Sequence, residues 1–486
     1  MSPTHHEHGN IGRNTAIQAI ERVASVVIGL VSMGVLTRYL GVHDFGLYST
    51  ALTYLQFFAT LLDGGFTILV VQMLSEHNRD HGRTLGALMS FRLVSAGVCF
   101  LILNAAIFLL PYPRIVQWSV VAGSLGFIAI LVTSVLTGVF RTKLAMLPVA
   151  LSDAAIRVLY LIAIVVAAWG HWSLIAIMIG LSIANIVPTI YLWWSARKRL
   201  SFELFWDWPL IREAFTRLWP LTMSMIFTLV YFRADTMILS FVATPEAVGL
   251  YAAPYKVLEV LINLPHLFLA LMLPFFTRSW QAKNNEELKH WWQLSVDVMM
   301  MILIPMVVGL YVVATPVMTL VAGQSFGVSG PLLQILIWSV AAIAMGTIAN
   351  YVIVAANEQH RMVKWYAITM AVALVGYCIF IPLYSYWAAA WLTLIVECFI
   401  ALMNIVVAYR LTRIKLSYAP MIKVIIAAAA MGVVVDWSAP ASLFAQIVIG
   451  ALVYSAIILL LGGIYPAMWR VLTMGLESRA PGHLEK

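Results

Sequence analysis

Charge is scarce in this chain of 486 residues: Asp, Glu, Lys and Arg make up 10% of it, whereas apolar residues make up 62%. Because a soluble domain is usually about half apolar and about a quarter charged, this composition excludes a water-soluble protein. Cysteine is scarce too: Cys99, Cys378 and Cys398 lie in apolar runs without paired spacing, which excludes a disulfide framework and a zinc site. No polar stretch is long enough for a separate catalytic domain. The sequence predicts an all-α polytopic membrane protein that is not an enzyme and needs no cofactor.

Long apolar runs separated by short polar breaks give the number of expected spans. A helix that crosses a bilayer needs roughly 20 mostly apolar residues. Fourteen runs satisfy this condition, at residues 15–37, 46–72, 85–110, 115–140, 145–169, 172–196, 214–241, 247–276, 291–314, 331–356, 363–384, 387–409, 420–436 and 442–468. The first run contains Glu21 and Arg22 and has full length, so cleavage as a signal peptide is not expected.

Basic residues are distributed unequally between the two sides of the predicted bundle. If both termini are cytoplasmic, 22 of the 29 Lys and Arg residues lie on the inner side and only Arg38 and Arg114 on the outer side. This bias predicts cytoplasmic termini. The net charge of +8 then faces anionic headgroups from many short segments, which argues against a nucleic-acid partner. The basic, tryptophan-containing segment 197–217 is interpreted as an interfacial linker, with an amphipathic surface helix as the alternative.

A short motif occurs twice. Gly-Leu-Tyr stands at residues 46–48 and again at 249–251, 203 residues later, each time at the outer start of a predicted span. Six spans separate the two copies, so the two halves have the same orientation, as in many transporters built from a duplicated unit. The predicted organisation is an N-lobe of six spans (1–196), a cytoplasmic linker (197–213), a C-lobe of six spans (214–411), and two accessory spans with a cytoplasmic tail (412–486).

Several spans have one polar face. Gln56 and Asp63 share a face of the second span, and the eighth span has Lys256, Glu259, Asn263 and His266 at helical spacing. Such faces either hold helices together or line a water-filled cavity. Because an ionisable side chain inside a membrane is costly, we favour the cavity for the charged residues.

The depth of the charged residues predicts two clusters. Arg233 and Lys256 lie at similar depth in the outer half, beside Asp235 and Glu259. Arg22 and Asp63 lie nearer the cytoplasm, where we expect them to pair. Ion pairs that form in one conformation and open in another suit alternating access.

Three further charged positions inside the spans receive separate interpretations. Asp153 and Arg157, at i and i+4, are expected to neutralise each other as a structural pair. Arg92 receives no special role. Glu397 lies at mid-membrane without a charged partner on its own helix, and is either kept protonated by its surroundings or takes part in ion coupling.

Several segments resemble one known family. The stretches 37–50, 61–66 and 231–259 and the loop GQSFG (323–327) are similar to the polysaccharide-export (Wzx-type) branch of the multidrug/oligosaccharidyl-lipid/polysaccharide (MOP) exporter superfamily, whose members flip undecaprenyl-diphosphate-linked oligosaccharides. The resemblance implies two six-helix lobes around a central cavity lined by helices 1, 2, 7 and 8. It also implies that cationic cavity residues, here Arg22, Arg233 and Lys256, hold the diphosphate and acidic sugars, while the prenyl chain stays in lipid. Lipid II flippases have several cavity arginines on helices 1, 2 and 8, whereas helix 2 has Asp63 here, which argues against a peptidoglycan precursor.

The expected function is therefore translocation of a prenyl-diphosphate-linked glycan across the cytoplasmic membrane. Gln56, Asn263 and His266 are further candidates for substrate binding, and Asp63, Asp235, Glu259 and Glu397 for gating or ion coupling. The expected partners are the lipid-linked glycan, membrane lipids, a glycan polymerase and other export proteins. A small-cation or drug exporter of the same superfamily is the alternative. A membrane glycan polymerase or ligase is disfavoured because the longest predicted outer loop, about residues 315–330, is uncharged.

Overall fold

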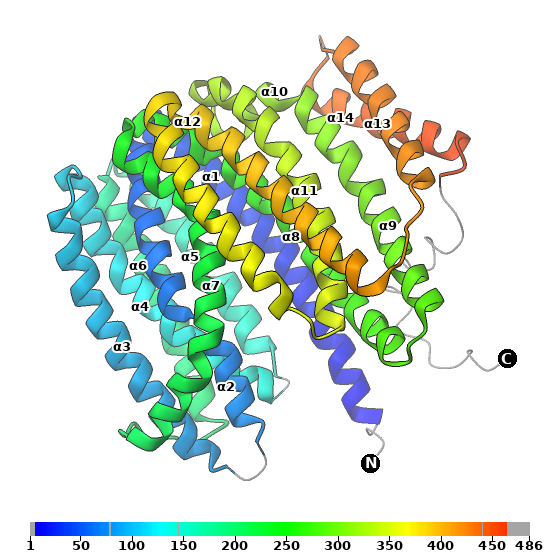
Figure 1. Ribbon diagram of the computed structural model, residues 1–486. Coiled ribbons are helices and arrows are strands. Elements are labelled where there is room, and N and C mark those ends of the chain that lie inside the picture. The colour runs from blue at the N-terminus through cyan, green and yellow to red at the C-terminus, as the bar shows by residue number, and fades with distance from the viewer. Residues whose placement is uncertain (1–4, 77–78, 144, 440, 464–486) are drawn as a thin grey trace. The chain divides into compact units, whose positions relative to one another are not determined.

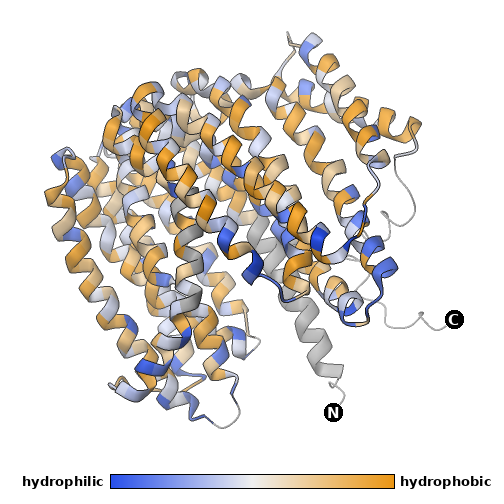
Figure 2. Cartoon of the chain, viewed as in Figure 1, coloured by the Kyte–Doolittle hydropathy of each residue, from blue (hydrophilic) through white to orange (hydrophobic). Residues whose placement is uncertain are grey.

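A computed structural model describes residues 5–76, 79–143, 145–439 and 441–463 (Figure 1). Side chains are not described for residues 5–23, for several residues between 220 and 232, or for residues 264 and 267. The described residues form helices and connecting segments and no strand, which confirms the all-α class. The helices are apolar along their lengths, and hydrophilic residues gather towards their ends (Figure 2).

The helices follow one another along the chain with short connections. They are α1 (His5–Asp63), α2 (Phe66–Leu74), α3 (His81–Leu109), α4 (Arg114–Thr142), α5 (Leu147–Trp169), α6 (Leu174–Arg197), α7 (Trp208–Val242), α8 (Pro245–Gln281), α9 (Asn285–Val312), α10 (Ala314–Ala322), a 3-10 helix η1 (Gln324–Ser329), α11 (Gly330–Ala355), α12 (His360–Thr412), α13 (Ala419–Trp437) and α14 (Leu443–Leu460).

Each predicted span corresponds to a helical segment, but two pairs of spans run together. α1 joins the first and second spans across a kink at Gly41 (φ 67°), and α12 joins the eleventh and twelfth across a kink at Ser385 (φ 52°). Positive φ is readily adopted by glycine and costs a serine about 1 kcal/mol or more. Among the described residues, eleven helical stretches are long and apolar enough to cross a membrane, and two of these contain the kinks. The protein is thus a polytopic membrane protein.

Glycine and proline act differently on the two helices in which the sequence places breaks. Gly64 (φ 49°) and Gly65 (φ 86°) separate α1 from α2, so the second span is broken as their sequence suggests. Pro254 and Pro265, by contrast, lie inside α8, which continues through both. Inside a membrane bundle, neighbouring groups can satisfy the backbone carbonyls that proline leaves open.

The segment between α6 and α7 is a linker and not a surface helix. Residues 201–207 are not helical, and α7 begins directly afterwards, with the Asp207 carboxylate accepting from the Leu210 amide (3.4 Å). The linker backbone packs on α3: a Cβ placed on Gly86 would lie 2.1 Å from the carbonyl oxygen of Glu203. Residues 208–217 of the segment thus belong to α7 and form no separate surface helix, and the linker bounds expected from the sequence, 197–213, stay a prediction.

Contacts divide the chain into two units. The first comprises Met1–Ala252 with Val321–Gly323, and the second comprises Ala253–Leu320 with Gln324–Lys486. α7 belongs to the first unit, and α8 begins in the first and continues in the second. The six-helix lobes predicted from the repeat, with a boundary at residue 213, stay a prediction.

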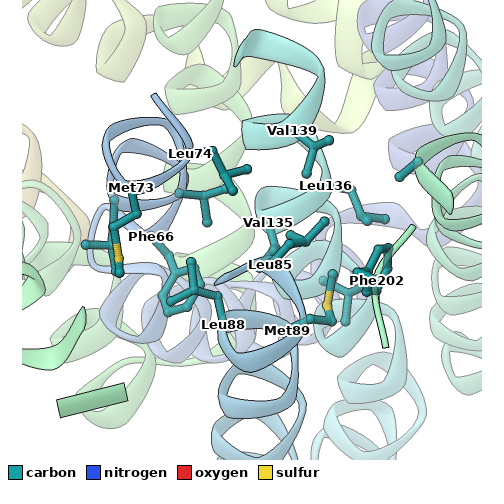
Figure 3. Packing of buried hydrophobic residues seen from close by; sticks show 14 of the residues in the cluster. Phe66, Met73, Leu74, Leu85, Leu88, Met89, Val135, Leu136, Val139 and Phe202 are labelled. Atoms are coloured by element: carbon teal, nitrogen blue, oxygen red, sulfur yellow. The ribbon is translucent and has the colours of Figure 1, made fainter. Parts of the chain in front are cut away.

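Each unit has its own apolar packing. In the first, α2, α3 and α4 enclose Phe66, Met73, Leu88 and Val135 together with Phe202 of the linker (Figure 3). In the second, Val313, Met431 and Val435 form a smaller cluster where α13 packs on α9. The larger cluster fixes the start of α2 and the middle of α3, and thereby positions the charged pair described next.

Candidate functional site

Arg92 of α3 is buried, and its guanidinium binds the end of α1. Its Nη2 donates to Asp63 Oδ1 (2.7 Å), its Nη1 to the Leu62 carbonyl (2.8 Å) and its Nε to the Leu131 carbonyl (3.0 Å), while its side chain lies over the Phe66 ring. A buried guanidinium is tolerable only when its donors are satisfied. The break at Gly64 leaves carbonyl groups of the last turn of α1 outside helical bonding, which makes the Leu62 oxygen available.

This geometry corrects the role given to Arg92 from sequence. Arg92 is 1% exposed and is paired with Asp63, so it is not a residue without a role. Arg22 was the partner expected for Asp63, and its side chain lies outside the described part of the chain. The Asp63 side chain keeps 34% of its surface exposed, and Gln56, two turns earlier on α1, is half-buried. Gln56 and Asp63 therefore form a partly open polar face within the first unit.

Asp235 of α7 is almost fully buried at 1% exposure. Its Oδ2 accepts from the Tyr251 hydroxyl, and its Oδ1 accepts from the backbone N–H (2.6 Å) and the hydroxyl (3.2 Å) of Thr236. Arg233, two residues earlier, is partly buried. The Asp235–Tyr251 bond joins the last turns of α7 to the first turns of α8, so Asp235 stabilises this helical corner.

α8 presents a polar face in the second unit. Lys256 Nζ lies 2.9 Å from Glu259 Oε2, and the two side chains are 33% and 25% exposed. Asn263 donates to the carbonyl of Glu259 (2.6 Å), and the exposed His266 has its ring centroid 6.5 Å from that of Tyr351 on α11. Lys256 and Glu259, which were expected to lie close together, thus form an ion pair between residues one turn apart. Asn263 and His266 extend the same polar face.

Glu397, Asp153 and Arg157 lie apart from these faces. Glu397 of α12 is buried, with 4% exposure. Asp153 and Arg157 are both half-buried, and Arg157 Nε is buried without a hydrogen-bond partner among the described residues. The expected structural pairing of Asp153 with Arg157 stays a prediction.

The two Gly-Leu-Tyr segments lie against each other within the first unit. A Cβ on Gly46 would lie 1.7 Å from the Pro245 carbonyl oxygen, and one on Gly249 would lie 2.3 Å from the Val42 carbonyl oxygen. His43 Nδ1 lies 2.5 Å from Glu246 Oε1, again 203 residues apart in sequence. We call these contacts the glycine joint. Backbones approach this closely only where no side chain intervenes.

The tyrosines of the two motifs form hydrogen bonds next to the glycine joint. Tyr48 is buried and its hydroxyl lies 2.7 Å from that of Tyr160 on α5, whereas buried Tyr251 donates to Asp235. Sequence analysis found the repeated motif but not the contact, because the spacing along a chain does not reveal which helix ends meet.

Four charges at the opposite end of α7 form a closed ring, which sequence analysis missed. Arg217 donates to Glu76 (2.5 Å) and to Glu213 (2.6 Å), and Arg79 donates to the same two carboxylates. These hydrogen bonds lower the pKa of Glu76 and raise the pKa of Arg79. We call Glu76, Arg79, Glu213 and Arg217 the charge ring. Alternating signs in segments 76–83 and 207–217 were the available signal.

Comparisons with known proteins agree with this architecture. The sequence profile of a family described as polysaccharide biosynthesis protein matches residues 11–280. No curated protein matches the chain.

Three solved structures with similar folds are distant in sequence. The lipid II flippase MurJ in an inward closed conformation is 15% identical, with a TM-score of 0.76 over 94% of this chain and 99% of that chain. An inward-facing multidrug resistance MATE family transporter of the MOP superfamily is 10% identical, with a TM-score of 0.66 over 81% and 94% of the two chains. A MOP superfamily transporter from Pyrococcus furiosus is 11% identical, with a TM-score of 0.60 over 83% and 96%. At these identities the likeness shows the fold alone.

Proposed function

The chain belongs to the polysaccharide biosynthesis protein family, and from this membership we propose that it flips an undecaprenyl-diphosphate-linked oligosaccharide from the cytoplasmic to the outer leaflet of the cell membrane. The membership confirms the resemblance seen in the sequence. The protein is a multi-pass membrane protein of a transporter family, not an enzyme. The oligosaccharide is proposed to be a repeat unit of an O-antigen or exopolysaccharide.

The observation that carries this proposal is the partly exposed Lys256–Glu259 pair on the membrane-spanning α8. Lys256 keeps a third of its side-chain surface exposed, although the helix around it is apolar. A charge exposed at membrane depth is costly unless it faces water or an ionic ligand. An ammonium group in that position suits a diphosphate, and the neutral donors of Asn263 and His266 next to it suit sugar hydroxyls.

Arg22, Arg233 and Gln56 of the first unit stay candidate substrate-binding residues, the two arginines for their positive charge and Gln56 for its neutral amide. The prenyl chain would stay among lipid tails, since a long apolar chain gains nothing by entering a polar cavity. The likeness to a lipid II flippase supports a lipid-linked substrate, and the involvement of Asp63 in holding Arg92 supports a headgroup other than lipid II.

Ion coupling is proposed to use the partly exposed carboxylates. Asp63 and Glu259 are reachable by a proton or a sodium ion, being 34% and 25% exposed in their side chains. Asp235 and Glu397 are buried, so ions would reach them only after a rearrangement. Alternating access, with both termini cytoplasmic, is the mechanism that such pairs suit.

The test is translocation of a fluorescent prenyl-diphosphate oligosaccharide in liposomes containing purified protein, with and without proton and sodium gradients. Lys256→Gln is expected to lower the initial rate at least tenfold, since a charge-assisted bond to phosphate is lost. Lys283→Gln, which removes one exposed inner charge, is the matched control and should leave the rate unchanged.

A double variant separates substrate binding from simple charge balance. If Lys256 only neutralises Glu259, then Lys256→Gln with Glu259→Gln restores transport. If Lys256 binds the diphosphate, the double variant stays slow. Restored transport would contradict the assignment of Lys256 to the substrate.

A multidrug or small-cation antiporter is a second candidate, favoured by Asp63, Asp235, Glu259 and Glu397 on membrane helices and by the fold of MATE transporters. Uptake of a labelled organic cation into the same liposomes distinguishes it from the flippase. Glycan polymerase and other export proteins are proposed as partners of the flippase in the cytoplasmic membrane.

A further inference from the structure

The ends of α4 and α6 carry five basic side chains that differ from the other basic residues of the first unit. Arg141 and Lys143 end α4, and Arg197, Lys198 and Arg199 end α6, and all five are exposed. We call these five residues the basic patch. Arg199 lies over the Phe140 ring of α4 at 5.7 Å, which brings the two helix ends together.

No carboxylate neutralises the basic patch. In the described part of the chain, none of its five side chains forms an ion pair, and Glu203, the nearest acid along the chain, is paired with none of them. By contrast, Arg79, Arg83 and Arg217 of the same unit all bind carboxylates. Five neighbouring cations without a counterion repel one another, so the patch is suited to an anionic ligand.

Aromatic rings hold these cations at the level of the membrane surface. Lys198 lies 3.4 Å from the centroid of Trp194, and Arg197 lies over both Trp193 and Phe202. Trp194 is exposed, as is usual for tryptophan at the boundary between lipid tails and headgroups. The positive-inside rule places both helix ends at the inner leaflet, where anionic lipids are found.

We propose that the basic patch is a binding site for an anionic phospholipid with two phosphate groups, such as diphosphatidylglycerol, in the inner leaflet. Arg141 and Lys143 face one phosphate from α4, and Arg197, Lys198 and Arg199 face the other from α6. The helix ends favour cations, so these side chains stay charged and positioned before a lipid arrives. The site binds a resident lipid and is separate from the proposed transport of a glycan.

Thermal unfolding of the purified full-length protein in detergent tests this inference. Added diphosphatidylglycerol is expected to raise Tm by on the order of 5 °C at a hundredfold excess over Kd. Phosphatidylglycerol at equal phosphate should raise it less, and phosphatidylcholine should leave it unchanged. Native mass spectrometry should show retained diphosphatidylglycerol.

Two triple variants with the same change in net charge decide between a site and general attraction. Arg141→Gln/Lys143→Gln/Arg199→Gln should abolish the shift and the retained lipid. Arg278→Gln/Lys283→Gln/Lys289→Gln removes three exposed charges from the α8–α9 connection and should keep both. Equal loss in the two variants, or an equal effect of phosphatidylcholine, would overturn the proposal.

A third variant shows whether the first triple variant loses lipid binding through loss of charge or through misfolding. Arg141→Lys/Arg199→Lys keeps the charges, and should keep most of the lipid-dependent shift. If it loses the shift while its Tm in phosphatidylcholine stays that of the unaltered protein, then charge is not what binds the lipid, and the proposal fails.

Discussion

The start of α7 and the start of α8, which follows it, are attached to the N-terminal helices by opposite physical means. At the start of α8 the glycine joint brings backbone against backbone, with Gly46 beside Pro245. At the start of α7 the charge ring connects Glu76 and Arg79 to Glu213 and Arg217 through side chains that are 20% to 38% exposed. Both attachments lie within the first unit.

The difference lies in what each attachment tolerates. Close packing depends on shape, so the glycine joint has no room for one added methyl group but is indifferent to salt. Exposed ion pairs are weak individually and are screened by salt within about 8 Å at physiological ionic strength. We infer that the glycine joint fixes the register of the two motifs, whereas the charge ring can form and separate reversibly.

The largest expected effect comes from Gly46→Ala. Its Cβ would overlap the Pro245 carbonyl oxygen, so the two segments must separate, at a cost of roughly 3 kcal/mol in the free energy of unfolding. Gly29→Ala is the control, because no atom lies within 4 Å of its Cβ and alanine favours a helix. Denaturant unfolding in detergent measures both. Equal stability of the two variants would contradict the role of the glycine joint.

A smaller effect is expected when the charge ring loses its cations. Arg79→Gln/Arg217→Gln leaves two carboxylates facing each other, and hydrogen exchange in residues 208–217 should accelerate on the order of tenfold. Exchange near Gly249 should not change. Arg361→Gln, which breaks an exposed pair with Glu358 in the second unit, is the matched control. In the unaltered protein, 0.5 M salt should reproduce part of the acceleration, and in the variant it should not.

The smallest effect is expected from acid. Hydrogen bonds from Arg79 and Arg217 lower the pKa of Glu76 from its ordinary value of 4.5. A lowered pKa in the folded state gives stability that is complete above pH 4.5 and is lost as the pH falls through the lowered value. Exchange at residues 208–217 should therefore rise below this pH, and the variant without Arg79 and Arg217 should show no such rise. Acid sensitivity confined to residues 42–50 would contradict this assignment.

The sequence predicted the helices well because the pattern that specifies them is local. Apolar runs of span length gave the long helical segments. They did not give α10 and η1, which lie where a loop at about residues 315–330 was expected. The kinks at Gly41 and Ser385 were expected as loops, since nothing in the sequence distinguishes a one-residue kink from a short connection.

The candidate site was less predictable because its partners come from distant segments. The Lys256–Glu259 pair is one turn apart and could be read from spacing, whereas Arg92 reaches Asp63 only because α3 packs against the end of α1. Spacing alone suggested Asp153 with Arg157, and that pairing stays a prediction. Favourable spacing on a helix permits an ion pair without requiring it.

At the helix break of Gly64 and Gly65, a backbone carbonyl takes the place of water as an acceptor for the buried guanidinium of Arg92. The turn that these glycines interrupt leaves the Leu62 oxygen open to the Arg92 guanidinium, which donates to it. Alanine at both positions would be strained at these positive φ angles, and a Cβ on Gly64 would lie 2.5 Å from the Thr222 hydroxyl oxygen. The interrupted helix and the buried Arg92 therefore depend on each other, because the break makes the Leu62 carbonyl available and Arg92 occupies it.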